Sequence, residues 1–158
     1  MGNHAHSTYQ ATNSPNYQLP SVILFDGVCN LCNACVRFVI ARDPAGRFQF
    51  GALQSPAARR LLNAIGSGPW PDSIVLVEDG RAWTRSAAAL RIARRLRFPW
   101  PLAYAFVAVP RPLRDWIYTV VARRRYRWFG RQAVCMVPTP ALAARFIDET
   151  SAGPQSPR

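Results

Sequence analysis

Residues 22–32 read VILFDGVCNLC and place two cysteines shortly after an apolar run. Residues 22–25 contain no polar side chain, which is typical of a strand buried on both faces. Residues 31–42 have apolar side chains at helical spacing and end before an Asp-Pro-Ala-Gly turn, so we predict a helix there. Cys29 and Cys32 therefore stand where a buried strand passes into a helix.

The rest of the pattern predicts three further strands and two further helices. Residues 47–50 alternate like a strand, and residues 56–65 carry a helical apolar pattern with proline in the first turn. An Asp-Gly pair joins predicted strands at 74–77 and 81–84 into a hairpin, and Ser86 is expected to cap a helix that reaches Leu96. The order β-α-β-α-β-β-α predicts an α/β thioredoxin-like core, whose sheet combines a parallel pair with an antiparallel hairpin.

The 158 residues are enough for one domain with one appended element. The predicted divisions are a flexible tail at 1–20, a thioredoxin-like core at 21–97, a helical appendage packed on the core at 98–148, and a flexible tail at 149–158. The appendage contains apolar residues at helical spacing, namely Leu113, Trp116, Ile117, Val120 and Val121. We predict that this stripe packs against the core while the neighbouring arginines face solvent.

The start of the first helix is where we expect the chemistry. Backbone N–H groups and the positive end of the helix dipole stabilise a thiolate there, so we expect Cys29 to be an exposed, readily ionised nucleophile. Cys32 follows one turn later and is expected to be the shielded, resolving thiol. Asp26 has two open interpretations: a buried carboxyl of raised pKa that relays protons for Cys32, or a turn residue that accepts backbone hydrogen bonds. Cys35 is predicted to be a small buried core residue.

Specific motifs recur along residues 21–147. They are Phe25-Asp26-Gly27-Val28-Cys29-Asn30-Leu31-Cys32-Asn33, Thr84-Arg85-Ser86 with Ala88-Ala89-Leu90, Arg114-Asp115 with Tyr118, Tyr126-Arg127-Trp128-Phe129-Gly130-Arg131 and Cys135-Met136-Val137-Pro138. Together they resemble the DCC family of predicted thiol-disulfide oxidoreductases. The resemblance implies a thioredoxin-like fold with Asp26, Cys29 and Cys32 at the site, and it adds Ser86 and Cys135. One departure from thioredoxins is that Asp72-Ser73 stands where they carry a cis-proline.

From these motifs we expect a thiol-disulfide oxidoreductase that needs no cofactor and acts on a protein or small-molecule disulfide or dithiol. Cys135 is predicted to pack near the Cys29 and Cys32 pair, with Ser86 nearby. A metal-binding protein is the main alternative, because Cys29, Cys32 and Cys35 match the first ligands of an iron-sulfur or zinc site that Cys135 could complete. Against it, Val39 occupies the expected fourth iron-sulfur position.

The formal net charge of +12 does not by itself indicate a nucleic-acid partner. All 20 cations are arginine, and a chain without lysine is typical of a GC-rich bacterial genome. Residues 97–131 combine eight arginines and nine aromatic residues with one acid, so a non-catalytic role at an anionic membrane surface is a second alternative. The apolar runs are too short to span a bilayer and no secretory signal is visible, so we expect a cytoplasmic protein.

Overall fold

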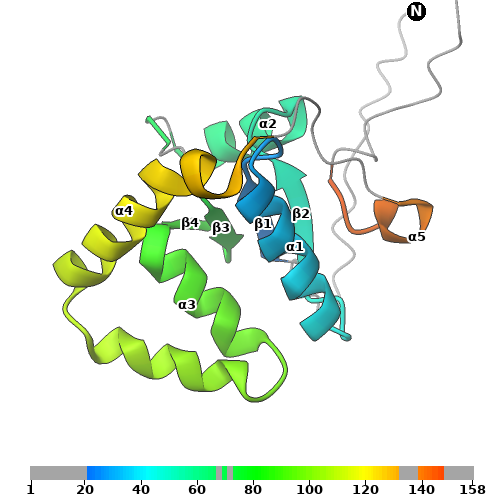
Figure 1. Cartoon of the computed structure of the whole chain (residues 1–158). Helices are drawn as coiled ribbons and strands as arrows, with labels where there is room; N and C mark the ends of the chain where they lie inside the picture. The colour runs from blue at the N-terminus through cyan, green and yellow to red at the C-terminus, as the bar shows by residue number, and fades with distance from the viewer. Residues whose placement is uncertain (1–20, 67–68, 71–72, 132–138, 148–158) are drawn as a thin grey trace, which may run out of the picture.

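The computed structural model describes residues 21–66, 69–70, 73–131 and 139–147. Figure 1 shows its elements, which are β1 (Ser21–Phe25), α1 (Asn30–Arg42), β2 (Phe48–Ala52), α2 (Pro56–Ile65), β3 (Val75–Glu78), β4 (Arg81–Thr84), α3 (Arg85–Arg95), the 3₁₀ helix η1 (Trp100–Ala108), α4 (Arg111–Phe129) and α5 (Pro140–Ala143). The first seven have the predicted order, and their bounds lie within two residues of the predicted ones.

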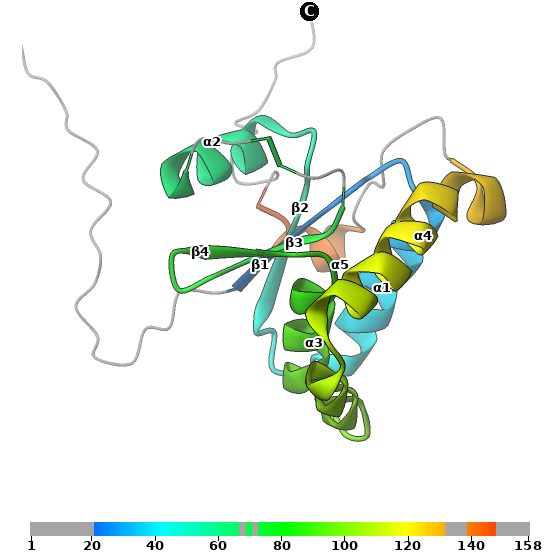
Figure 2. The ribbon, with the colours of Figure 1, turned by 90° about the vertical axis from the view of Figure 1, so that its left-hand side faces the viewer.

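The strands form one mixed sheet in the order β2-β1-β3-β4. β1 is parallel to β2 and antiparallel to β3, and β4 is antiparallel to β3. Helices α1 and α3 pack on one face of the sheet and α2 packs on the other, which Figure 2 shows nearly edge-on. The thioredoxin-like α/β fold class predicted from the sequence is confirmed.

The two faces of the sheet pack against different helices. All five residues of β1 are buried, and successive side chains enter opposite faces. Ile23 and Phe25 pack with α1 and α3, whereas Val22 and Leu24 pack with α2. At the far end of β3, Asp79 and Gly80 both adopt positive φ, at 50° and 70°, so the predicted Asp-Gly hairpin turn is confirmed.

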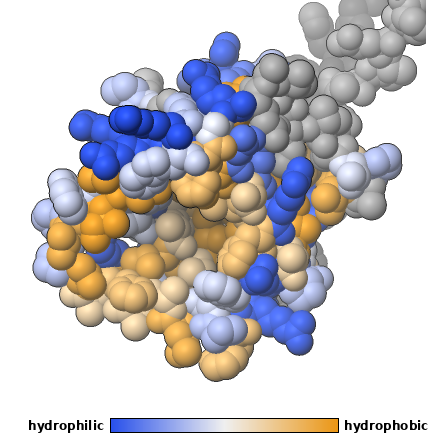
Figure 3. Space-filling view, viewed as in Figure 1, coloured by the Kyte–Doolittle hydropathy of each residue, from blue (hydrophilic) through white to orange (hydrophobic). Residues whose placement is uncertain are grey.

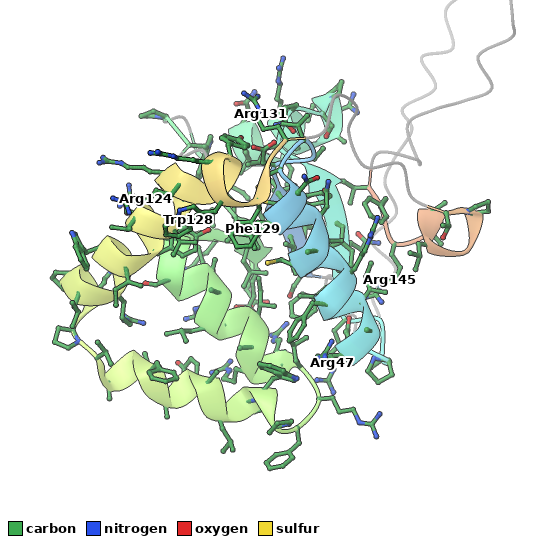
Figure 4. The ribbon with its side chains drawn as sticks, in the orientation of Figure 1. Arg47, Arg124, Trp128, Phe129, Arg131 and Arg145 are labelled. Carbon is green, nitrogen blue, oxygen red and sulfur yellow. The ribbon has the colours of Figure 1, made fainter. Side chains whose placement is uncertain are left out.

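The segment after α5 contributes to this core. The Phe50 N–H donates to the Arg145 carbonyl at 2.7 Å, and the Ile147 N–H donates to the Phe50 carbonyl at 2.8 Å. Phe146, 4% exposed, thereby packs edge-on against Phe25. Arg145, labelled in Figure 4, forms an ion pair with Asp43 at 2.5 Å. Residues close to the C-terminus therefore complete the face that α1 and α3 cover.

The apolar stripe of helix α4 faces outward, which is the opposite of the predicted orientation. Leu113, Trp116 and Ile117 are 50%, 64% and 51% exposed, so the prediction that the stripe packs against the core is wrong. The other side of the helix carries polar groups with partners inside the protein: Asp115, Tyr118, Arg125 and Tyr126. Figure 3 shows the resulting hydrophobic surface at the lower left, over η1 and α4.

Ser86 also has a different role from the one predicted. α3 begins at Arg85 with Thr84 before it, so Ser86 lies inside the first turn instead of capping it. The Ser86 hydroxyl donates to the carboxylate of Asp115 in α4. It therefore joins α3 to α4 rather than closing the end of a helix.

Candidate redox site

Cys29 occupies the N-cap position of α1, directly beyond the loop that follows β1. Its sulfur accepts the backbone N–H of Cys32 at 3.4 Å, and its own N–H donates to the Asp26 carbonyl at 3.2 Å. Both cysteines are free thiols, one helical turn apart, as the sequence predicted. The helix start thus holds one sulfur against an N–H donor and places a second thiol beside it.

Cys32 is the half-buried member of the pair. Burial, followed by its hydrogen bond to Cys29 and the charge of Cys29, raises the pKa of Cys32 to about 12. The Arg125 guanidinium acts in the opposite direction but does not offset these causes. Cys32 is therefore protonated at neutral pH, which leaves Cys29 as the thiol better placed to attack.

Cys29 is fully buried, so the prediction that it is exposed is wrong. The end of α4 crosses beside it: the Asn30 side-chain amide donates to the Phe129 carbonyl at 2.8 Å, and the Asn30 backbone N–H donates to Gly130 at 3.4 Å. Cys29 itself forms an isolated antiparallel bridge with Arg131. Figure 4 shows Phe129 and Arg131 at this end of α1. Partners about 100 residues away in sequence therefore lie beside Cys29, and no local sequence pattern indicates them.

Asp26 is buried and accepts hydrogen bonds on both carboxylate oxygens. Oδ1 accepts from the Val28 N–H at 3.1 Å and from the Gln54 amide at 3.0 Å. Oδ2 accepts from the Arg125 guanidinium at 3.1 Å and from the Tyr126 hydroxyl. Burial alone would raise the pKa of Asp26, but these donors outweigh it and the pKa is lowered.

The lowered pKa separates the two interpretations of Asp26. A carboxylate held ionised by several donors is a weak base, so the prediction of a raised pKa is wrong, and the proton relay stays a prediction. The hydrogen bond from the Val28 N–H confirms the turn interpretation. Asp26 also does more than close a turn, because it ties the loop before Cys29 to α4 through Arg125 and Tyr126.

Sequence reasoning missed Arg125 and Tyr126. A buried carboxylate needs a cationic or hydrogen-bonding partner, so a buried Asp26 could have suggested an arginine. With 20 arginines in the chain, however, the sequence could not indicate which one. Arg125 is 4% exposed, the only arginine among the buried residues of the described chain.

The remaining candidate residues are Ser86, Cys35 and Cys135. Ser86 bonds to Asp115, whose pKa is lowered chiefly by that hydrogen bond, and Arg111 lies 3.5 Å from the same carboxylate. Cys35 is exposed, so the prediction that it is a buried core residue is wrong. Cys135 lies outside the described residues, and its predicted proximity to the cysteine pair stays a prediction.

A cavity of about 410 Å³ lies beside the Asp26 contacts. Arg125 and Tyr126 line it together with Ser73, Arg85, Tyr118, Thr119, Ala122 and Arg123. The Ser73 hydroxyl is buried and has no hydrogen-bond partner among the described residues. Guanidinium groups and hydroxyls therefore surround a space large enough for a small polar group, next to the arginine that contacts Asp26.

Two features of the described residues bear on the alternatives. Within the described ranges, no three His, Cys, Asp or Glu side chains are grouped to hold a metal ion. Cys29, Cys32 and Cys35 thus form no such group with one another, and Cys135 lies outside the described residues. In the same part of the chain, no helix is long and apolar enough to cross a membrane.

Comparison with known proteins identifies the family. The sequence model for DCC1-like thiol-disulfide oxidoreductases matches residues 23–131. The chain belongs to this family. YuxK, an uncharacterized protein of Bacillus subtilis, is 48% identical to it over 132 residues, which cover 82% of this chain and 96% of that protein. A chloroplastic DCC family protein of Arabidopsis thaliana is 44% identical over 118 residues, or 72% of this chain and 67% of that protein. No solved structure matches the DCC1-like chain.

Proposed function

We propose that this DCC1-like protein exchanges disulfides through Cys29 and Cys32, with Cys29 as the nucleophile. The asymmetry of the pair carries the proposal. The Cys29 sulfur accepts an N–H at the start of α1, whereas the Cys32 thiol has a pKa of about 12. The two adjacent thiols therefore differ: one sulfur accepts an N–H at a helix start and the other thiol stays protonated at neutral pH, an asymmetry that suits sequential exchange.

In the proposed reaction the Cys29 thiolate attacks one sulfur of a substrate disulfide. A mixed disulfide forms, and the second substrate sulfur leaves as a thiolate that takes a proton from water. Cys32 then loses its proton to water and attacks the Cys29 sulfur, which releases the first substrate sulfur. Two electrons have passed to the substrate, Cys29 and Cys32 are joined by a disulfide, and a cellular dithiol returns them to thiols by the same exchange.

The causes of the raised Cys32 pKa give the two steps their order. The hydrogen bond to Cys29 and the charge of Cys29 both raise that pKa, after burial. In a mixed disulfide the Cys29 sulfur cannot carry a charge, so the charge contribution to the raised pKa of Cys32 is absent and that pKa is lower. Cys32 thus becomes a better nucleophile only after the first step has taken place.

The carboxylate of Asp26 acts in this scheme as a positioning group. Its hydrogen bonds to Val28 and Gln54 shape the loop before Cys29, and its contacts with Arg125 and Tyr126 bring α4 over that loop. Cys29 is buried and the Phe129–Arg131 segment lies beside it, so we infer that this segment moves when a substrate disulfide reaches the sulfur. Access to Cys29 is therefore coupled to the end of α4.

Dithiothreitol-driven reduction of a fluorescent disulfide peptide tests the proposal. Cys29→Ser should abolish turnover. Cys32→Ser, reduced first and then separated from dithiothreitol, should accumulate a mixed disulfide with the peptide at Cys29. Cys35→Ser is the matched control, because its thiol is exposed and lies one further turn along α1; it should keep turnover within about twofold of the parent. Mixed disulfides that form equally in Cys29→Ser would refute the assignment.

A further inference from the structure

The large apolar side chains exposed on the described part of the chain are concentrated in one region. We call this region the apolar face; its members are Phe98, Trp100, Leu102, Phe106, Val107, Leu113, Trp116, Ile117, Val121 and Trp128. Phe129 is also exposed, but it lies at the end of α4 beside Asn30 and is not part of this face. The members of the apolar face belong to η1, to α4 and to the turn before η1. η1 contains no charged residue and has no buried residue among its nine. Single exposed apolar residues are ordinary, but a gathering of this size marks a contact surface.

The orientation of α4 makes this exposure a property of the fold. Its inward side is held by the Asp26 contacts of Arg125 and Tyr126, and by the Tyr118 hydroxyl, which accepts the Ile74 N–H at 3.2 Å. Turning the apolar stripe inward would break these contacts and leave the Asp26 carboxylate buried without its cation. The helix is therefore fixed with its polar side inside and its apolar side outside.

Exposed cations lie in the same stretch of the chain as the apolar face. Six of the eight arginines in residues 97–131 are exposed: Arg97, Arg111, Arg123, Arg124, Arg127 and Arg131. The only acid in this range, Asp115, is engaged by Ser86 and Arg111. The Arg124 guanidinium lies over the Trp128 ring at 5.7 Å, and Figure 4 shows both on α4. Aromatic and cationic side chains thus share one surface without exposed carboxylates.

We propose that the apolar face lies in the headgroup region of an anionic bilayer, with η1 and α4 along the membrane plane. Tryptophan, phenylalanine and leucine side chains enter the boundary between headgroups and acyl chains, and arginines reach anionic phosphates from the same side. Arginines interrupt the apolar stripe of α4. Charged side chains are costly at the bilayer centre, so this pattern favours a position at the boundary. Charge disfavours two copies pairing through this face, because each would bring the same six arginines. The apolar side chains have no role in binding a nucleic-acid backbone.

Co-sedimentation of the full chain with vesicles tests this surface. Binding should be strong to vesicles of equal parts phosphatidylglycerol and phosphatidylcholine, and weak to phosphatidylcholine alone. Raising NaCl from about 0.1 M to about 1 M should weaken binding, because screening removes the charge contribution. Tryptophan emission should shift to shorter wavelength on binding, since Trp100, Trp116 and Trp128 leave water.

Two double variants separate the apolar and charge contributions. Phe106→Ser with Trp116→Ser should reduce binding about tenfold or more. Arg124→Gln with Arg127→Gln should reduce it about fivefold for each arginine removed and should lessen its salt dependence. Arg59→Gln with Arg81→Gln is the matched control, because both arginines are exposed but lie on α2 and β4; it should bind close to the parent level.

Three results would overturn the proposal. One is binding that is equal on neutral and anionic vesicles and unchanged by the Phe106 and Trp116 substitutions. Another is a dimer in analytical ultracentrifugation that the same substitutions dissociate, which would assign the face to a second copy. The third is duplex DNA binding with the same dependence on these apolar side chains. Circular dichroism of each variant confirms that it is folded.

Discussion

The sheet core and helix α4 use similar amphipathic patterns in opposite ways. In α1, α2 and α3 the apolar side chains face the sheet, and Val36, Leu62 and Ile92 are all buried. In α4 the apolar stripe faces outward, while Arg125 and Tyr126 reach the buried carboxylate of Asp26. A buried ionised group can thus set the orientation of a helix against its apolar periodicity, because that group must have its partners.

This orientation has a cost that bears on the proposed membrane contact. Leaving a large apolar side chain in water instead of burying it forgoes about 1.5–3 kcal/mol. Leu113, Trp116 and Ile117 each forgo part of that amount, since each is about half exposed or more. Contact with a bilayer would recover it, so the arrangement of α4 is consistent with a surface that is covered in use.

The largest stability effect is expected in the sheet core. Phe50 is fully buried against Phe146, so Phe50→Ala should lower the free energy of unfolding by about 3–5 kcal/mol. Urea denaturation followed by circular dichroism measures this. A loss below about 1 kcal/mol would mean that the C-terminal segment does not pack on β2 as described.

Substitutions on the polar side of α4 should lower the free energy of unfolding nearly as much. Arg125→Met leaves the Asp26 carboxylate buried without its cation, so we expect a loss of about 3 kcal/mol. Adding Asp26→Asn should restore part of that stability, since the uncompensated charge is then removed. If the two groups do not interact, the stability losses of Arg125→Met and Asp26→Asn simply add. A double variant whose loss equals that sum would therefore contradict the contact.

Acid should weaken the same contact. The pKa of Asp26 is lower in the folded protein than its ordinary value of 3.8, so its contribution to stability is present above that value and is lost as pH falls through the folded pKa. The unfolding midpoint in urea should therefore decrease below about pH 4. Asp26→Asn should make this decrease smaller, and an unchanged acid profile in that variant would contradict the assignment.

A smaller effect is expected where the end of α4 covers Cys29. Asn30→Ala removes the hydrogen bond to the Phe129 carbonyl, which contributes about 1 kcal/mol and should raise the alkylation rate of Cys29 about fivefold. Iodoacetamide labelling with peptide mapping measures each cysteine separately. Asn63→Ala, on the exposed side of α2, is the control. Unchanged labelling of Cys29 would show that this contact does not limit access.

The smallest effect should be on the outward side of α4. Trp116 is 64% exposed, so Trp116→Ala should change the free energy of unfolding in solution by about 0.5 kcal/mol or less. The difference between the stability losses of Trp116→Ala and Phe50→Ala directly tests whether the first side chain faces outward and the second faces the core. A loss above about 2 kcal/mol would place the Trp116 ring in a packed core and contradict the outward orientation.

Local signals in the sequence were sufficient for the core fold. The apolar run before Asp26, the proline at the start of α2 and the Asp79-Gly80 turn each act through neighbouring residues, so periodicity and turn chemistry could predict β1 to α3. The same reasoning placed Cys29 and Cys32 at the start of α1, one turn apart. Both features depend on backbone geometry within a few residues.

The order of strands and helices, the position of the cysteine pair and the resemblance to the DCC family could all be predicted from the sequence. The inward side of α4, the burial of Cys29 beside Phe129–Arg131 and the lowered pKa of Asp26 emerge only in the folded chain. These three outcomes depend on contacts between residues about 100 positions apart, Asp26 with Arg125 and Tyr126 and Asn30 with Phe129. Periodicity reports that a helix has two unlike sides, but the energy of burying a charge with its partner determines which side is buried.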